Sequence, residues 1–552
     1  MSGFDVRQLS SLEKVFLDYK MPKSEFKRIS VLKNEKFSYQ LAYKITEEFH
    51  LSPIKIEVNS ALRDLVTVRW VGNVPVEMPT YSWADKNYER LTPGLYPDVL
   101  YPIKENCTIA RSMNAWHSLW ITVCLDGSIP AGKYPVEISL SVENSANGSK
   151  TVVKTLQVEI VDALLPEQEL KLTQWFHTDC IADYYKVPVF SEEHWNLVDK
   201  FVKMAADNGI NMILTPIFTP PLDTEVGGER PTVQLVDVEK TGDTYRFNFD
   251  KLRRWIHMCQ KNGIRYFEMA HLFTQWGLKC TPKIVATEDG VQKRIFGWDV
   301  AADDPAYMNF LSQMLPQLNR VLVEEGVSQN TYFHISDEPH TEHIERYKKL
   351  KAEVSKLLPG YIFMDALSNY EFYSEGAVDC PIPASNAIEP FIENNVPGLW
   401  TYYCCGQCKD VSNRFIAMPS YRTRVIGLQF YKFAIEGFLQ WGYNFYNSSL
   451  SRMHIDPFRV TDAVGAFPAG DAFSVYPGEE GPLESLRILV FFDALQDLRA
   501  LKLLESYIGK EKVVGIIEDT AGMEIRFSKF PHKKEFLLKL REKINQEIKK
   551  HI

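Results

Sequence analysis

The sequence lacks the features of an exported protein or a membrane protein. Its N-terminus, MSGFDVRQLSSLEKVF, has no basic segment followed by an apolar one, and no apolar run reaches the length of a bilayer span. The 9 cysteines are an odd number scattered over 552 residues, which does not suit a disulfide framework. From these absences we expect a cytoplasmic protein with reduced thiols and no membrane insertion.

The sequence also lacks an excess of positive charge. Its formal net charge is −9, which argues against nucleic acid and anionic membranes as partners. Hydrophobic residues make up 45% of the chain and charged residues 24%, the balance of a folded globular protein. Neutral or weakly charged substrates fit this composition best, and a chain of this length needs more than one domain.

No pattern for a metal or a cofactor stands out. There is no H-E-x-x-H motif, and the cysteines of YYCCGQCKD (residues 402–410) have no second C-x-x-C or histidine pair at a suitable spacing. His177, His271 and Asp365 could chelate a metal if they met at one end of a barrel. We expect no metal and no cofactor, and we interpret the cysteines as buried or loop thiols.

Residues 1–165 contain short segments rich in β-branched and aromatic residues, separated by turn residues. With no long helical pattern between them, these segments predict an N-terminal β-sandwich domain, followed by a linker at residues 164–170. The seven segments are KRISVLKN, KFSYQLAYKI, PIKIEVNS, DLVTVRWVG, SLWITVCLDG, GKYPVEISLSV and KTVVKTLQVEIVD.

From residue 170 to residue 447 a short apolar run is followed again and again by an amphipathic helical pattern. This alternation predicts an α/β fold, a (β/α)8 TIM barrel, because a doubly wound sheet would need a Gly-rich turn after its first strand and WFHTDC has none. The runs are residues 171–177, 211–218, 265–273, 331–337, 361–367, 380–385, 398–404 and 437–446. Residues 448–552 are expected to form a loop and a short helical extension packed on the barrel.

Two adjacent carboxylates, Asp337 and Glu338, end the fourth of these runs in TYFHISDEPH. Catalytic residues of a barrel gather at the C-terminal ends of its strands. Two close carboxylates in a poorly solvated cleft push one pKa up, which leaves one proton donor and one anion, the division of labour that glycosidases need. An Asp-Glu pair more often belongs to a solvated loop, but its place after a buried strand makes this pair the predicted catalytic site.

Aromatic and polar residues at the other strand ends fit a sugar site. Apolar faces of sugars stack on aromatic rings, and histidine and aspartate side chains bind hydroxyl groups. A single aromatic residue at such a position more often belongs to the barrel core, but a whole ring of them favours a site. The residues expected to bind substrate are Trp175, His177, His271, Trp276, Asp365, Trp400, Tyr402, Trp441 and Tyr446.

The segment FHISDEPH, followed later by GDAFSVYPGEEGPLESLRILVFFDALQDLRALKLL, resembles glycoside hydrolase family 123 and its wider relatives. The resemblance covers the barrel and the tail. In the later segment it rests on Gly470, Asp471, Tyr476, Pro477, Gly478, Ser485, Arg487, Asp493 and Asp497. It implies a β-N-acetylgalactosaminidase, a retaining exo-enzyme whose substrate is an oligosaccharide or a glycoconjugate with terminal β-linked N-acetylgalactosamine.

The resemblance also implies substrate-assisted catalysis, in which the 2-acetamido oxygen of the sugar attacks the anomeric carbon and forms an oxazolinium-like intermediate. By this resemblance Glu338 acts as general acid and then as base, and Asp337 orients the acetamido group. A tyrosine, either Tyr402 or Tyr446, would support that group. No nucleophile from the protein is then needed.

Two other interpretations remain open at the level of the sequence. An ordinary two-carboxylate glycosidase would take its nucleophile from another strand end, such as Glu389 or Asp365. A non-catalytic barrel would bind carbohydrate without hydrolysing it, although the Asp337–Glu338 pair argues against this interpretation.

Overall fold

The computed structural model describes residues 3–45, 53–103, 114–144 and 148–552, which divide into two compact units. The sandwich unit comprises Met1–Gln168, Lys409–Lys432 and Leu483–Ile552, and the barrel unit comprises Glu169–Cys408 and Phe433–Pro482. The domain boundaries expected from the sequence, 1–165, 170–447 and 448–552, stay a prediction.

The barrel unit is built on eight parallel strands that follow one another in chain order, which confirms the predicted fold. They are β10 (Lys171–Gln174), β11 (Met212–Thr215), β14 (Tyr266–Met269), β17 (Thr331–Phe333), β18 (Ile362–Ala366), β19 (Cys380–Ile382), β20 (Trp400–Tyr402) and β21 (Gly437–Gln440). The sheet closes because the amide of Tyr402 donates to the carbonyl of Pro383 (3.0 Å) and the amide of Ser385 donates to that of Tyr402 (2.8 Å). Each strand lies within one of the predicted apolar runs, as parallel strands buried on both faces require.

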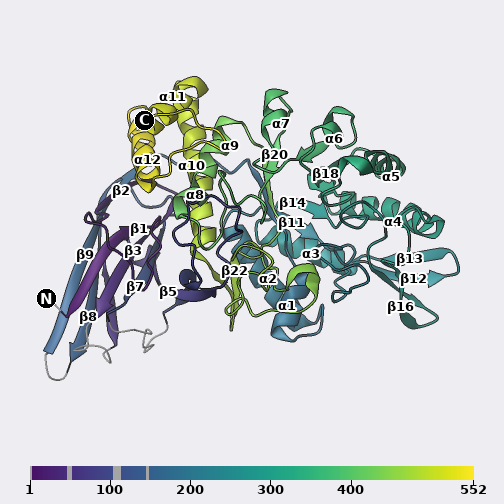
Figure 1. Ribbon diagram of the computed structural model, residues 1–552, viewed down its shortest axis with the longest axis horizontal. Coiled ribbons are helices and arrows are strands. Elements are labelled where there is room, and N and C mark those ends of the chain that lie inside the picture. The colour runs from purple at the N-terminus through teal and green to yellow at the C-terminus, as the bar shows by residue number, and fades with distance from the viewer. Residues whose placement is uncertain (1–2, 46–52, 104–113, 145–147) are drawn as a thin grey trace. The chain divides into compact units, whose positions relative to one another are not determined.

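Helices flank these strands in Figure 1. They are α1 (Thr178–Tyr185), α2 (Glu192–Asp207), α3 (Asp250–Lys261), α4 (Pro305–Glu324), α5 (Ile344–Leu357), α6 (Glu371–Ser374) and α7 (Glu389–Glu393). Local chemistry sets their starts: the Ser191 hydroxyl accepts from the amide of His194 before α2, and the Asp304 carboxylate accepts from the amide of Ala306 before α4. Short 3-10 turns at Ser328–Asn330, Thr341–His343 and Ser449–Ser451 complete the unit.

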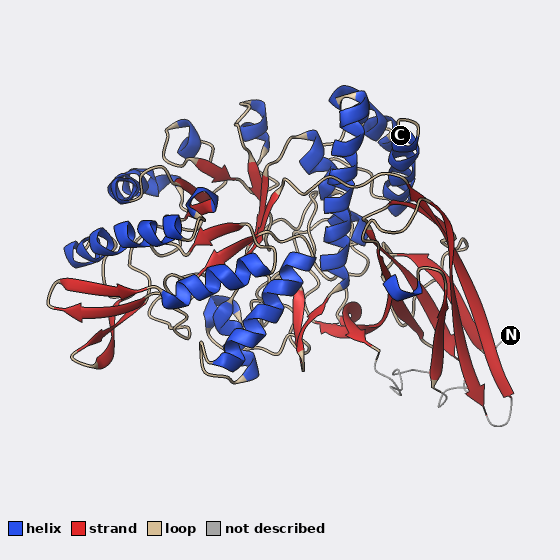
Figure 2. Cartoon of the chain, turned by 180° about the vertical axis from the view of Figure 1, so that it is seen from behind, coloured by secondary structure: helices blue, strands red, loops and turns tan. Residues whose placement is uncertain are grey.

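The segments after the second and third barrel strands each contain a hairpin, which the pattern of apolar runs did not predict. They are β12 (Asp237–Thr241) with β13 (Thr244–Asn248), and β15 (Ile284–Glu288) with β16 (Val291–Phe296). The hairpins join into one four-stranded sheet in the order β13-β12-β15-β16, and Figure 2 shows them extending away from the barrel strands.

The sandwich unit contains two sheets, as predicted. One has the order β1-β3-β7-β5-β6 and the other β2-β9-β8-β4. The strands are β1 (Phe4–Ser10), β2 (Arg28–Leu32), β3 (Lys36–Ile45), β4 (Ile54–Asn59), β5 (Val66–Val76), β6 (Gly94–Pro102), β7 (Trp116–Cys124), β8 (Gly132–Asn144) and β9 (Gly148–Val161). Alternate residues of both sheets form a continuous apolar core, for example Leu41, Ile121 and Ile138. The seven predicted segments overlap β2 to β5 and β7 to β9, while β1 and β6 were not predicted.

Helices from two later chain segments complete the sandwich unit. They are α8 (Ser420–Arg424), α9 (Ile426–Lys432), α10 (Leu486–Ile508), α11 (Lys510–Ala521) and α12 (Lys534–Lys549). The helical extension expected at the end of the chain consists of α10, α11 and α12. Between barrel and tail, the expected polar loop contains a short hairpin, β22 (Val475–Gly478) with β23 (Gly481–Glu484).

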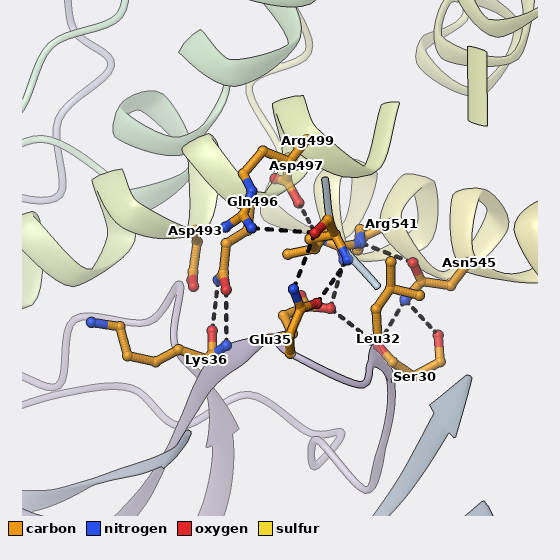
Figure 3. A network of polar contacts seen from close by, with 12 residues as sticks. Ser30, Leu32, Glu35, Lys36, Asp493, Gln496, Asp497, Arg499, Arg541 and Asn545 are labelled. Atoms are coloured by element: carbon orange, nitrogen blue, oxygen red, sulfur yellow. Dashed lines mark hydrogen bonds and ion pairs between the residues drawn. The ribbon is translucent and has the colours of Figure 1, made fainter. Parts of the chain in front are cut away.

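A buried polar network joins the helices to the strands inside the sandwich unit (Figure 3). Arg541 of α12 donates to Glu35 (2.7 Å) and to Asp497 of α10 (3.0 Å), and Arg424 of α8 binds the same Asp497 through two nitrogens. Burial alone would raise the pKa of Asp497, but the two guanidinium groups hold this pKa below its usual value. Removing one partner from such a network leaves an uncompensated buried charge, which costs about 3–5 kcal/mol.

Among the described residues, no helix combines the length and the apolar composition needed to cross a bilayer.

Candidate active site

The C-terminal ends of the barrel strands surround one cavity with an empty volume of about 600 Å³, its open mouth included. Six of the residues predicted from the sequence line it: Trp175, Trp276, Asp337, Glu338, Tyr402 and Trp441. The other lining residues are Leu222, Asp223, Gln275, Ala366, Cys404, Cys405, Leu439 and Phe467.

Asp337 and Glu338 reach this cavity on a segment whose backbone is fixed by its neighbours. The amide of Trp276 donates to the carbonyl of Asp337 (3.1 Å), and the amide of Glu338 donates to the carbonyl of Ala366 (3.2 Å). Glu338 has φ of 44°, in the left-handed region, so the chain turns sharply between the two carboxylates. Because neighbouring residues of a regular strand point to opposite sides, this turn allows both side chains to line one cavity.

The two carboxylates have different surroundings. The Tyr402 hydroxyl donates to Oε1 of Glu338 at 2.8 Å. Burial, the neighbouring Glu338 and the nearby Asp365 raise the pKa of Asp337 well above its usual value.

A buried ionic bridge lies behind the cavity wall. His334 is fully buried, with Nδ1 at 3.1 Å from Oδ1 of Asp365 and Nε2 at 2.9 Å from Oε2 of Glu268. The indole nitrogen of Trp175, a cavity residue, also donates to Glu268 (3.2 Å). Asp365, which the sequence predicts at the mouth, is therefore part of this bridge and is not among the cavity-lining residues.

His271 stacks on His334 with 4.3 Å between ring centroids and 20° between planes. It is fully buried, and neither ring nitrogen has a hydrogen-bond partner within the described structure. Burial and the neighbouring His334 lower its pKa well below the usual value, so the ring is neutral.

The ligand atoms of His271, His334 and Asp365 lie within 4.8 Å of one another. Nearly parallel stacked rings direct their in-plane lone pairs side by side, which is a poor geometry for one shared metal ion.

His177 belongs to a second buried cluster, with Arg230 and Asp179. Arg230 donates to both oxygens of Asp179 (2.7 and 2.8 Å) and to Nδ1 of His177 (3.1 Å). Burial and the guanidinium lower the pKa of His177 to about 3. The ring is therefore neutral, with Nδ1 as acceptor and Nε2 donating to the carbonyl of Trp441 (2.8 Å). Arg230 also donates to the carbonyl of Leu222 (3.0 Å), so the cluster anchors a loop that reaches the cavity.

That loop carries Asp223, a cavity carboxylate that sequence analysis missed. Its amide donates to Oε1 of Gln275 (2.7 Å), and its Oδ2 accepts from the amide of Leu450 (3.0 Å). Burial raises the pKa of Asp223 to about 6. The residue lies in a long loop after β11 and not at the strand end, so the rule that selected the other candidates did not reach it.

The remaining predicted aromatic residues divide between the cavity and the protein interior. Trp441 lines the cavity, and its indole nitrogen donates to Asp471 (2.8 Å), a residue of the GDAFSVYPG segment. Trp400 is buried inside the barrel against Tyr332, at 6.2 Å between ring centroids. Tyr446 is buried and donates to the carbonyl of Val475 (3.0 Å). Neither Trp400 nor Tyr446 is among the residues that line the cavity.

Comparison with known proteins finds a family whose catalytic domain matches this chain. The model of the catalytic domain of glycoside hydrolase 123 matches residues 175–504. A family 123 glycoside hydrolase from Clostridium perfringens, solved to give the details of glycolipid glycan hydrolysis, superposes with a TM-score of 0.73 at 14% identity, covering 100% of this chain and 97% of that one.

Two further solved structures have much lower scores. A family 5 mannosidase from Rhizomucor miehei has a TM-score of 0.33 at 11% identity, covering 63% of this chain and 94% of that one. A family 39 glycoside hydrolase from Bacteroides cellulosilyticus has a TM-score of 0.34 at 11% identity, covering 79% and 77%. No curated protein matches the sequence significantly.

Proposed function

Because the chain belongs to glycoside hydrolase family 123, and so is a glycosidase that acts on glycans, we propose that it removes terminal β-linked N-acetylgalactosamine by substrate-assisted, retaining catalysis. The observation that carries this proposal is the pair Asp337 and Glu338, which line one cavity from adjacent positions while Tyr402 binds Glu338. The Clostridium perfringens enzyme acts on glycolipid glycans, and we extend a glycoconjugate substrate to this chain as part of the proposal.

In this mechanism the acetamido oxygen of the sugar attacks the anomeric carbon as the glycosidic bond breaks. Glu338 gives its proton to the leaving oxygen and later takes a proton from the water that opens the oxazolinium-like intermediate. Tyr402 holds the Glu338 carboxyl group in place, and it is the candidate of the two tyrosines that lines the cavity.

In this mechanism Asp337 accepts a hydrogen bond from the N–H of the acetamido group. The N–H of that group becomes more acidic as its oxygen bonds to the anomeric carbon and positive charge develops. A carboxylate with a raised pKa is a stronger acceptor for this proton than an ordinary one. Adjacent carboxylates then make chemical sense, since one serves the leaving oxygen and the other serves the acetamide beside it.

The test is hydrolysis of three p-nitrophenyl β-glycosides: the N-acetylgalactosaminide, its gluco epimer and the galactoside without the acetamido group. We expect the wild-type protein to cleave only the first at a substantial rate, and Glu338→Gln and Asp337→Asn each to lose most of this activity. Comparable cleavage of the plain galactoside would refute substrate assistance.

A second mechanism is supported by one observation, the carboxylate of Asp223 in the cavity wall. An ordinary two-carboxylate glycosidase needs a nucleophile there, whereas Asp365 and Glu389, the two residues considered from the sequence, do not line the cavity. A 2-fluoro sugar would trap a glycosyl ester on the nucleophile. An ester on Asp223 would establish this route, and no ester together with strict need for the acetamido group would exclude it.

A further inference from the structure

The buried bridge formed by Glu268, His334 and Asp365 has no part in the steps described above, because none of these residues lines the cavity. All three side chains are fully buried. A buried ionic group costs stability unless it is fully paired, so this arrangement calls for a reason beyond packing. Its histidine, His334, lies just before the carboxylate pair in the sequence.

His334 carries a positive charge in this bridge. Both of its ring nitrogens face carboxylates, and both must carry hydrogen for the two contacts to be hydrogen bonds. Burial would lower the pKa of the ring, but the two carboxylates outweigh burial and raise the pKa to about 9. At neutral pH the ring is an imidazolium held from two sides.

The same carboxylate that binds the imidazolium also binds the chain leading to the catalytic pair. Oδ2 of Asp365 accepts from the amides of Ile335 (3.1 Å) and Ser336 (3.3 Å). The hydroxyl of Tyr347, from α5, donates to this oxygen as well (2.5 Å). The other oxygen of Asp365, Oδ1, accepts a hydrogen bond from Nδ1 of His334. The orientation of one side chain therefore determines the position of the residues immediately before Asp337.

The other end of the bridge is connected to a residue that lines the cavity. Glu268 accepts from the hydroxyl of Thr173 and from the indole nitrogen of Trp175, which lines the cavity. The bridge thus joins β10, β14 and β18 to the residue that follows β17, and it contacts both the cavity residue Trp175 and the segment that carries the carboxylate pair. A reacting group displaced by about 1 Å can lose roughly 10²-fold in rate, so this rigidity has a catalytic consequence.

We propose that His334 is a positioning residue: held as an imidazolium between Glu268 and Asp365, it fixes the segment that carries the catalytic carboxylates without touching the substrate. The inference rests on the proposed function, in which Asp337 and Glu338 perform the catalysis. It assigns to the histidine of FHISDEPH a role distinct from theirs.

The first experiment compares His334→Gln with the wild-type protein, using whichever of the three p-nitrophenyl glycosides the wild type cleaves. We expect kcat to fall about 10²-fold while KM changes less than about threefold, because the substrate contacts stay and only the reacting groups move. The matched control is His194→Gln. His194 is also fully buried in the barrel unit and accepts from the amide of Phe190 (2.9 Å), but it lies at the start of α2.

The second measurement is amide hydrogen exchange of the peptide spanning residues 331–338, which needs no substrate. His334→Gln should accelerate exchange of the amides of Ile335 and Ser336, because Asp365 loses the partner that orients it. If His334→Gln does not fold, Tyr347→Phe removes one hydroxyl donor from Asp365 and keeps the ring. We expect this variant to show the same pattern with a loss in kcat of roughly tenfold.

The inference is overturned if His334→Gln or Tyr347→Phe keeps kcat at the level of the His194→Gln control, or if exchange at Ile335 and Ser336 is unchanged. A wild-type protein that cleaves none of the glycosides would refute the proposed function, and the exchange measurement would still decide the positioning role. The two failures are therefore distinguishable.

Discussion

Replacing Tyr402 by phenylalanine removes one oxygen atom at the centre of the site and leaves the ring in place. The lost contact is the 2.8 Å hydrogen bond from the Tyr402 hydroxyl to Oε1 of Glu338. Glu338 becomes charged as it gives up its proton, and a hydrogen bond to a charged group contributes about 1.5–3 kcal/mol. Because about 1.4 kcal/mol is tenfold in rate, the expected loss in kcat/KM is roughly 10- to 150-fold. If the hydroxyl also supports the acetamido group in the transition state, the loss falls at the upper end of this range.

The assay compares Tyr402→Phe with Tyr446→Phe on the N-acetylgalactosaminide. Sequence reasoning left both tyrosines open as the acetamide partner, and the structure separates them, because the hydroxyl of Tyr446 donates to the carbonyl of Val475 and does not reach the cavity. Tyr446→Phe should keep kcat/KM within about threefold of wild type and lose about 1 kcal/mol of stability from the broken hydrogen bond.

Thermal unfolding of both variants provides the control for folding. The reasoning fails if Tyr402→Phe retains wild-type kcat/KM, since the contact with Glu338 would then make no difference to the reaction. It also fails if Tyr446→Phe loses as much activity as Tyr402→Phe while both remain folded, because the catalytic tyrosine would then have been assigned to the wrong strand.

Three further predictions concern buried or half-buried charges. Arg230→Met leaves the buried Asp179 carboxylate without its partner and should lower the free energy of unfolding by about 3–5 kcal/mol, measured by urea titration; a change below 1 kcal/mol would contradict this. Asp223 should accept hydrogen bonds from hydroxyl groups of the sugar more strongly when ionised, so KM should rise as pH falls through about 6, and a flat KM profile in wild type would contradict this. The bridge around His334 stabilises the fold fully below the unfolded pKa of about 6.5, and this contribution should decline as pH rises from there through about 9. His334→Gln should remove that decline from the pH profile of unfolding, and a decline of the same size in the variant would assign it to another group.

Much of the barrel could be predicted because its strands carry a strong local signal. A parallel strand buried on both faces is a short apolar run, and the helices between such strands have a different period, so the alternation is visible without tertiary information. The signal fails for β6, whose sequence GLYPDVLYP has a glycine, two prolines and an aspartate, all of which are typical of turns. The aspartate, Asp98, is fully buried because Arg487, 389 positions away, donates to both of its oxygens. No local pattern contains that partner.

The candidate site, like the fold, could be predicted from the sequence only in part. The rule that active residues follow barrel strands finds Asp337 and Glu338 and the aromatic residues that line the cavity. The rule does not distinguish a side chain that lines the cavity from one that lies behind its wall, so His271 and Asp365 were expected at the mouth although both are fully buried. It also misses Asp223, which a loop brings to the cavity, because the path of a long loop depends on distant anchors such as Arg230.

The adjacency of the two carboxylates carries a structural cost. A non-glycine residue in the left-handed region, where Glu338 lies, costs about 1–2 kcal/mol, and burial of Asp337 beside other acids adds electrostatic repulsion. An unsupported segment would relax by turning one carboxylate toward water. Here the amide of Glu338 is bound by the carbonyl of Ala366, the carbonyl of Asp337 is bound by Trp276, and the preceding amides are bound by Asp365. The strain is thus maintained by contacts from β18 and from the loop after β14, which is why we assign the function of the site to this supporting structure as well as to the two carboxylates.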